Sequence, residues 1–148
     1  MRKGFTLIEL LIVMIIVSTL VAIALPKYQT ALERGRSLEG LRNVQYAAEY
    51  TNARHEACKI AGRTDEECQY SNFSLPQTDR IKSRFFGIPV SADNGTVTLS
   101  RLGGDWRYSF IATIDTDNGA LYKIECSNTG EEDVCGRLDL TGNLMTRK

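Results

Sequence analysis

The chain begins with an apolar segment that has a single charge inside it. From Phe5 to Pro26 nearly every residue is apolar, and none from Leu10 onward is charged. A helix of about 20 apolar residues is long enough to cross a bilayer. The one charge is Glu9, and an ionisable side chain within a membrane helix is by default a functional residue. The pattern therefore predicts a membrane-spanning helix with a functional carboxylate near its start.

The region from Lys27 to about Cys58 predicts an amphipathic continuation of this helix. It is rich in helix-forming residues and contains no proline. Pro26 is expected to kink the combined helix of about 50 residues, because proline removes a backbone hydrogen bond and clashes with the preceding turn. Gly35 and Gly40 fit either close packing or bending in an assembly, or simple tolerance. One buried stripe is expected at spacings of three and four, comprising Leu38, Leu41, Val44, Ala48 and Thr51.

The second half of the chain has the alternating pattern of β-strands. An irregular connection over residues 59–95, with a short helix expected to start at Thr64, leads into it. Alternation predicts strands at 96–99, 106–112 and 121–126, and a short fourth strand at 137–140. One face of such a sheet needs cover, which the amphipathic helix supplies. The predicted fold class is α+β, a long N-terminal helix packed on a roughly four-stranded antiparallel sheet.

The four cysteines form two pairs that are close in sequence. Their spacing is not that of a zinc site, and the lone His55 adds little as a ligand. In an exported chain, cysteines predict disulfides, and three pairings are possible for four cysteines. Cys58–Cys68 and Cys126–Cys135 are favoured, because each pair closes a short loop rich in polar and acidic residues.

The start of the chain carries a specific motif. The string Gly4-Phe5-Thr6-Leu7-Ile8-Glu9, followed by apolar residues, resembles the class III signal of type IV prepilins and pseudopilins. The resemblance covers roughly residues 1–30. It includes Pro26-Lys27-Tyr28, whereas Ser18 stands where many members carry glycine. It implies a leader peptide at 1–4, a hydrophobic transmembrane and assembly helix at 5–28, and a globular head at 29–148, arranged as a pilin ladle. The Cys126–Cys135 pair resembles the disulfide-bounded C-terminal loop of many type IV pilins.

The resemblance also implies how the chain is processed. Prepilin peptidase would cut between Gly4 and Phe5 and then N-methylate Phe5. Loss of Arg2 and Lys3 changes the formal balance from 18 basic and 18 acidic residues to 16 and 18. In a fibre, Glu9 of an incoming subunit would pair with the Phe5 amine of its neighbour. Because a buried charge left unpaired costs about 3–5 kcal/mol, Glu9 is predicted to set the assembly register.

The function implied by the resemblance is that of a structural subunit of a type IV pilus that supports adhesion, motility or DNA uptake. The subunit would sit in the bacterial inner membrane before assembly and then in an extracellular filament. Its implied partners are other copies in a helical homopolymer, prepilin peptidase, the inner-membrane assembly platform, and membrane lipid. One alternative is a major pseudopilin of a type II secretion system; those tend to bind calcium, carry a Trp-Gly stretch and lack disulfides. A membrane-anchored adhesive or DNA-binding module that never polymerises would have no use for Glu9.

Other candidate chemistry is less well supported by the residues. The segment from Asp115 to Gly119 resembles a calcium loop, but its glycine comes one place early and no acid follows at the required position, so a hairpin turn and no metal site are predicted. With one histidine, no nucleophile elbow and no phosphate loop, neither an enzyme nor a cofactor is expected. Nucleic-acid binding would need clustered cations. The candidates are instead spread through a neutral chain, at Arg80, Lys82, Arg84, Arg101 and Arg107, with Phe85, Phe86 and Trp106.

Overall fold

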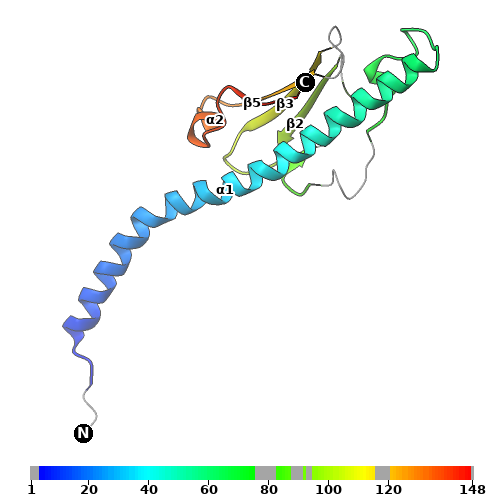
Figure 1. The fold of residues 1–148 in the computed structure, drawn as a ribbon. Coiled ribbons are helices and arrows are strands. Elements are labelled where there is room, and N and C mark those ends of the chain that lie inside the picture. Colours follow the sequence, from blue (N-terminus) through cyan, green and yellow to red (C-terminus); the bar gives the residue numbers. More distant parts are fainter. Residues whose placement is uncertain (1–3, 76–82, 88–91, 93–94, 116–120, 148) are drawn as a thin grey trace. The chain divides into compact units, whose positions relative to one another are not determined.

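The computed structural model describes residues 4–75, 83–87, 92, 95–115 and 121–147. They fall into two compact units, Met1–Gly35 and Arg36–Lys148. One helix, α1 (Leu7–Ile60), runs through both, and the β-strands follow it in the chain (Figure 1). The second unit is called the head below.

Helix α1 has a defined signal at each end. At its start, the Glu9 carboxylate accepts hydrogen bonds from the backbone and hydroxyl of Thr6, the reciprocal arrangement known as a capping box. At its end, Gly62 adopts a φ of 71°, which glycine reaches without steric cost, and the Arg63 N–H donates to the Cys58 carbonyl. The 54-residue helix therefore confirms the prediction of one long N-terminal helix.

The head contains a five-stranded antiparallel sheet in which sequence neighbours are also spatial neighbours. Its strands are β1 (Phe86–Gly87), β2 (Thr96–Arg101), β3 (Tyr108–Asp115), β4 (Leu121–Asn128) and β5 (Asn143–Arg147). The register places Val97, Ala112 and Ile124 side by side across three strands, and all three are buried. The outward positions of β2 and β4 carry polar and charged side chains such as Thr98 and Lys123. This alternation is what produced the strand pattern in the sequence.

The part of α1 in the head packs on the apolar face of the sheet, and the contact depends on small residues. Gly40 is buried, and a Cβ built there would come 2.6 Å from Phe86 Cζ and 2.8 Å from Phe110 Cε2. The predicted stripe is correct for Val44, Ala48 and Thr51 but wrong for Leu38, which is 59% exposed. The rings of Phe86 and Phe110 fill the space beside Gly40. The buried face of the helix therefore carries a small residue there, and Leu38 lies on the exposed face.

Two predicted elements are wrong. Residues 137–140 are not a strand, because Arg137 ends the short helix α2 (Val134–Arg137) and Asp139 has a φ of 57°; the fifth strand lies further on, at β5. Strand β1 lies inside the stretch that was expected to be irregular throughout. The helix expected at Thr64 is a single turn, which Glu67 caps at the Thr64 backbone, and a 3-10 helix (Tyr70–Asn72) follows it.

Candidate functional site

The apolar segment of α1 exposes its side chains on all sides within the chain. Phe5 is 85% exposed, and every residue from Gly4 to Gln29 is exposed. Its most apolar window has a mean hydropathy of 2.8 and none of that window is buried, so by length and composition the helix can cross a membrane. A helix that is apolar all round is expected to be covered by lipid or by other apolar helices. The segment is therefore the candidate assembly surface.

Glu9 lies on this surface, and one of its oxygens is already engaged. Glu9 Oε2 accepts from Thr6 N at 3.1 Å and from Thr6 Oγ1 at 2.9 Å. An ionised carboxylate has about four lone-pair sites on two oxygens. The capping box therefore fixes the direction of the side chain while the other oxygen retains its capacity to accept a hydrogen bond.

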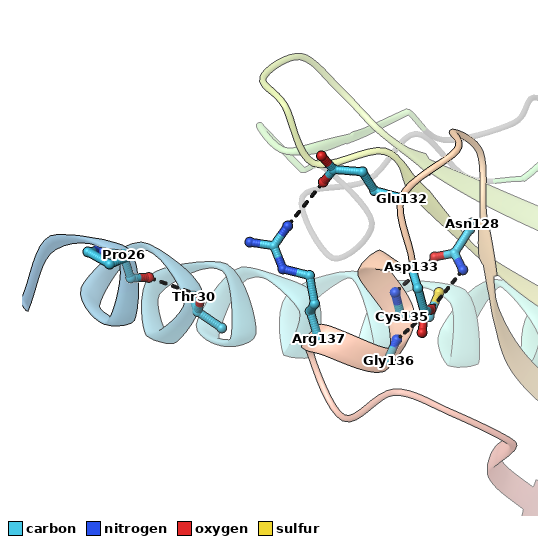
Figure 2. Close-up of polar contacts among 8 residues, drawn as sticks. All are labelled: Pro26, Thr30, Asn128, Glu132, Asp133, Cys135, Gly136 and Arg137. Atoms are coloured by element: carbon cyan, nitrogen blue, oxygen red, sulfur yellow. Dashed lines mark hydrogen bonds and ion pairs between the residues drawn. The ribbon is translucent and has the colours of Figure 1, made fainter. Parts of the chain in front are cut away.

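Pro26 lies inside α1, and the hydroxyl of Thr30 bonds back to its carbonyl. Thr30 Oγ1 donates to the Pro26 carbonyl at 3.1 Å, one turn further along (Figure 2). Ser18 Oγ makes a similar bond to the Ile15 carbonyl at 2.9 Å, so the hydroxyl that replaces the usual glycine is satisfied within the helix. The kink at Pro26 stays a prediction.

The first disulfide joins the end of α1 to the capped turn that follows it. Cys58 and Cys68 are bonded, with Cα atoms 5.6 Å apart. The buried His55 lies beside them: its Nδ1 is 2.6 Å from the Cys68 carbonyl oxygen, and its ring stacks on Tyr70 at 4.3 Å. No local sequence pattern assigns His55 a structural role. Its contacts form only because the loop after α1 returns onto the helix.

The second disulfide, Cys126–Cys135, closes a loop that is held by hydrogen bonds. Asp133 Oδ1 accepts from Gly136 N and from Asn128 Nδ2, both at 3.0 Å, and Asn128 Oδ1 accepts from Cys135 N (Figure 2). These bonds favour the charged carboxylate, so they lower the pKa of Asp133, the Gly136 bond most. Both disulfides are those favoured from the sequence.

The cations and rings considered for nucleic-acid binding have other contacts in the structure. Phe86 is buried in the core, and Arg101 donates to the Phe85 carbonyl at 3.2 Å and lies over the Phe85 ring. Arg107 packs its aliphatic stem beside Gly130. Arg80 and Lys82 lie outside the described residues. Phe86, Arg101 and Arg107 therefore make contacts within the head, whereas Arg84 is exposed.

The segment from Asp115 to Gly119, considered as a calcium loop, lies largely outside the described part of the chain. Residues 116–120 of the β3–β4 connection are not described, although Asp115 pairs with Leu121 in the antiparallel register of a hairpin. Among the described residues, no three His, Cys, Asp or Glu side chains are grouped closely enough to hold a metal ion.

A long N-terminal helix, apolar and exposed in its first half and packed on an antiparallel meander in its second, defines a pilin-like α+β protein. Known sequences agree with this class. Residues 1–25 match the prokaryotic N-terminal methylation motif. A fimbrial protein of Dichelobacter nodosus is 46% identical over 145 residues, which are 98% of this chain and 79% of that protein. The chain belongs to the type IV pilin family.

Two further relatives match over shorter stretches. The type IV major pilin protein PilE1 of Neisseria gonorrhoeae is 35% identical over 69% of this chain, and the type IV major fimbrial protein FimA of Dichelobacter nodosus is 37% identical over 46% of it. These matches span 59% and 40% of the lengths of those relatives. No solved structure matches the chain.

Proposed function

We propose that the chain is a structural subunit of a type IV pilus and polymerises through the first half of α1. The observation that carries the proposal is the fully exposed apolar helix with one carboxylate near its start, on a chain whose relatives are named as pilins and fimbrial proteins. These names and the two disulfides favour a pilin over a type II pseudopilin. The proposed role is structural rather than enzymatic, and adhesion, motility or DNA uptake are properties of the assembled filament.

The processing steps belong to this proposal. Prepilin peptidase cuts between Gly4 and Phe5 and methylates the new amine, and the assembly platform then moves the subunit from the inner membrane into the extracellular filament. The match to the N-terminal methylation motif supports this order. Gly4 lies outside α1, which begins at Leu7, so the peptide bond to be cut is not protected by helical hydrogen bonds.

Glu9 is proposed to set the register between subunits. A neighbour's Phe5 amine carries a positive charge. The Glu9 oxygen that does not bind Thr6 can accept a hydrogen bond from that amine. The capping box keeps the carboxylate in a fixed orientation before the pairing occurs. In an incorrect register both charges would be buried without partners, at a cost of about 3–5 kcal/mol.

Mass spectrometry of sheared filaments tests the proposal. The expected species is a chain that begins at N-methylated Phe5 and has lost residues 1–4. A Gly4→Asp variant should accumulate as uncut precursor in the membrane, because only a small residue fits before the cleaved bond. Assembled protein that still begins at Met1 would contradict the class III signal.

A further inference from the structure

The start of α1 has an apolar groove, called the N-terminal groove below, which lies within the first compact unit. Its apolar wall consists of four residues at spacings of three and four, which share one face of the first two turns. These four residues are Leu7, Leu10, Leu11 and Met14. Phe5 and Thr6 complete the lining at the end of the groove that precedes the helix.

The side chains of this face differ in shape from those on the other side of the same turns. The groove carries leucine and methionine, whereas Ile8, Ile12 and Ile15 follow the opposite side of the helix. Isoleucine is branched at Cβ and therefore stiff at χ1. Methionine is unbranched and fills irregular gaps in apolar contacts. The N-terminal groove is therefore the face that adapts more easily to an inserted side chain.

The capping box brings a negative charge to the polar end of the groove. Glu9 Oε2 accepts hydrogen bonds from Thr6 N at 3.1 Å and from Thr6 Oγ1 at 2.9 Å, and Thr6 is a groove residue. The groove thus combines an apolar wall with a carboxylate at one end. An N-terminal residue with an aromatic side chain has the complementary chemistry, because its amine is positive and its ring is apolar.

Phe5 becomes such a residue when the leader is removed. Its ring does not fill the groove of its own chain, because Phe5 lies at the edge of the groove and is 85% exposed. We propose that the N-terminal groove of one subunit binds the Phe5 ring of the neighbour whose amine pairs with Glu9. The inference rests on that pairing in the proposed function.

The ring adds a constraint that the ion pair lacks. A point charge can be approached from several sides, whereas a ring in a groove fixes the side on which the neighbouring helix lies. Each subunit gives its Phe5 ring to one neighbour and receives the ring of another. This is a heterologous contact, the kind that produces an open filament when the rotation does not close.

Photo-crosslinking of assembled filaments tests the contact. Phe5 is replaced by p-benzoylphenylalanine, which keeps an aromatic ring and bonds covalently to C–H groups that it touches when irradiated. Sheared filaments should yield a covalent dimer whose linked peptide carries the bond at Leu10, Leu11 or Met14. A bond to the isoleucine face would overturn the proposal. A link within one chain, or an adduct with lipid, would overturn it too, and would identify the chain's own ring or an acyl chain as the occupant.

Paired substitutions give a second measurement that needs no bulky probe. Leu10 and Ile12 are matched, because they are 56% and 50% exposed and lie on opposite sides of the helix. Leu10→Ala and Ile12→Ala are each made with and without Phe5→Ala, and the ratio of sheared to membrane-held mature subunit is measured. Residues in contact are coupled by at least about twofold. The effect of Leu10→Ala should therefore shrink at least about twofold when residue 5 is alanine, whereas that of Ile12→Ala should not change.

The outcomes separate the groove from the proposed function. Equal coupling of Phe5→Ala to both substitutions, or coupling to neither, would overturn the proposal for the groove while leaving the filament subunit intact. Absence of filaments from the unaltered chain would contradict the proposed function itself.

Discussion

At the scale of single residues, the contact between α1 and the sheet depends on Gly40, a residue without a side chain. Gly40 allows the rings of Phe86 and Phe110 to approach the helix backbone, and these rings also contact Tyr108. A glycine inside a helix costs about 0.5–1 kcal/mol relative to alanine. The packing of the aromatic cluster offsets this cost at Gly40. Gly35 has open space where its Cβ would be, so nothing comparable offsets it there.

Alanine substitutions at the two glycines should therefore have opposite effects. Gly40→Ala should destabilise the head by about 1–3 kcal/mol, because a methyl group overpacks the ring cluster. Gly35→Ala should be neutral or stabilising by up to about 1 kcal/mol, from helix propensity alone. Thermal unfolding of the mature chain in detergent, followed by the fluorescence of Trp106, measures both. A stabilising Gly40→Ala would contradict the close packing described here.

Asp133 should make the C-terminal loop sensitive to acid. Its pKa is lowered in the folded chain by the bond from Gly136 N and then by that from Asn128. Because the folded pKa lies below the unfolded one, the contribution is present above the ordinary pKa of about 4 and is lost as pH falls through the folded value. Asp133→Asn should reduce the decline in melting temperature below about pH 4.

Glu131→Gln is the control for this acid effect. Glu131 lies in the same loop, is exposed, and has no hydrogen bond within the described part of the chain. Its substitution should leave the acid decline unchanged. Trp106 is a suitable probe because Arg137 of α2 lies 4.9 Å from its ring centre. An identical decline in the Asp133→Asn variant would show that the loop hydrogen bonds do not favour the charged form.

At the scale of elements, the predictable features were those with a local signal. The apolar run and the spacing from Lys27 onward predicted α1, and alternation predicted β2, β3 and β4. Strand β1 has two residues and depends on pairing with Ser100 and Arg101, which no local pattern shows. Leu138 and Leu140 alternate like a strand. Their burial instead comes from a turn in which Leu140 N donates to the Cys135 carbonyl, because the disulfide brings the chain back onto the core.

The candidate site residues could likewise be predicted where they have a local sequence signal, but not where they depend on contacts between residues distant in the sequence. Glu9 stands out in the sequence because it is a lone charge in an apolar run. Its bond to Thr6 follows from the capping-box spacing, which occurs again at Thr64 and Glu67. The structural role of His55 depends on a contact with Cys68 thirteen positions away, and sequence spacing does not show such contacts.

Removing the second disulfide should loosen one element and leave the other intact. Cys126→Ser with Cys135→Ser should cost about 2–3 kcal/mol, as expected for a loop of this length. Amide hydrogen exchange should accelerate at α2 and at the turn after it, while the buried face of α1 near Val44 and Thr51 keeps its protection. Cys58→Ser with Cys68→Ser should instead accelerate exchange around Tyr70. Equal acceleration in α1 and α2 would contradict this separation.

At the scale of the whole molecule, the chain combines a head that has its own buried apolar core with an apolar helix segment whose side chains are exposed. The head buries its apolar residues between α1 and the sheet, and two disulfides hold its loops. The first unit exposes nearly all of its apolar side chains. Such a surface is stable in lipid or against copies of itself. In the proposed function, transfer from the membrane to a filament exchanges one apolar environment for another, and the charge at Glu9 is the feature proposed to distinguish correct from incorrect packing.

Filament yield in Glu9 variants tests this account most directly. Glu9→Gln should be inserted and cleaved normally, because Gly4 and the apolar run are unchanged, but it leaves the neighbouring amine without a counter-charge. Glu67→Gln removes the acid of the equivalent capping box in the head and should assemble normally. Thr6→Val removes the hydroxyl bond while keeping the charge, so it should cause a smaller defect than Glu9→Gln.

Immunoblots of sheared and membrane fractions decide the outcome. The account predicts a sharp fall in sheared filament for Glu9→Gln and an equal or greater fall for Glu9→Leu, with mature subunit persisting in the membrane. Normal filament yield from both Glu9 variants would contradict it, and would mean that apolar packing alone sets the register of the subunits.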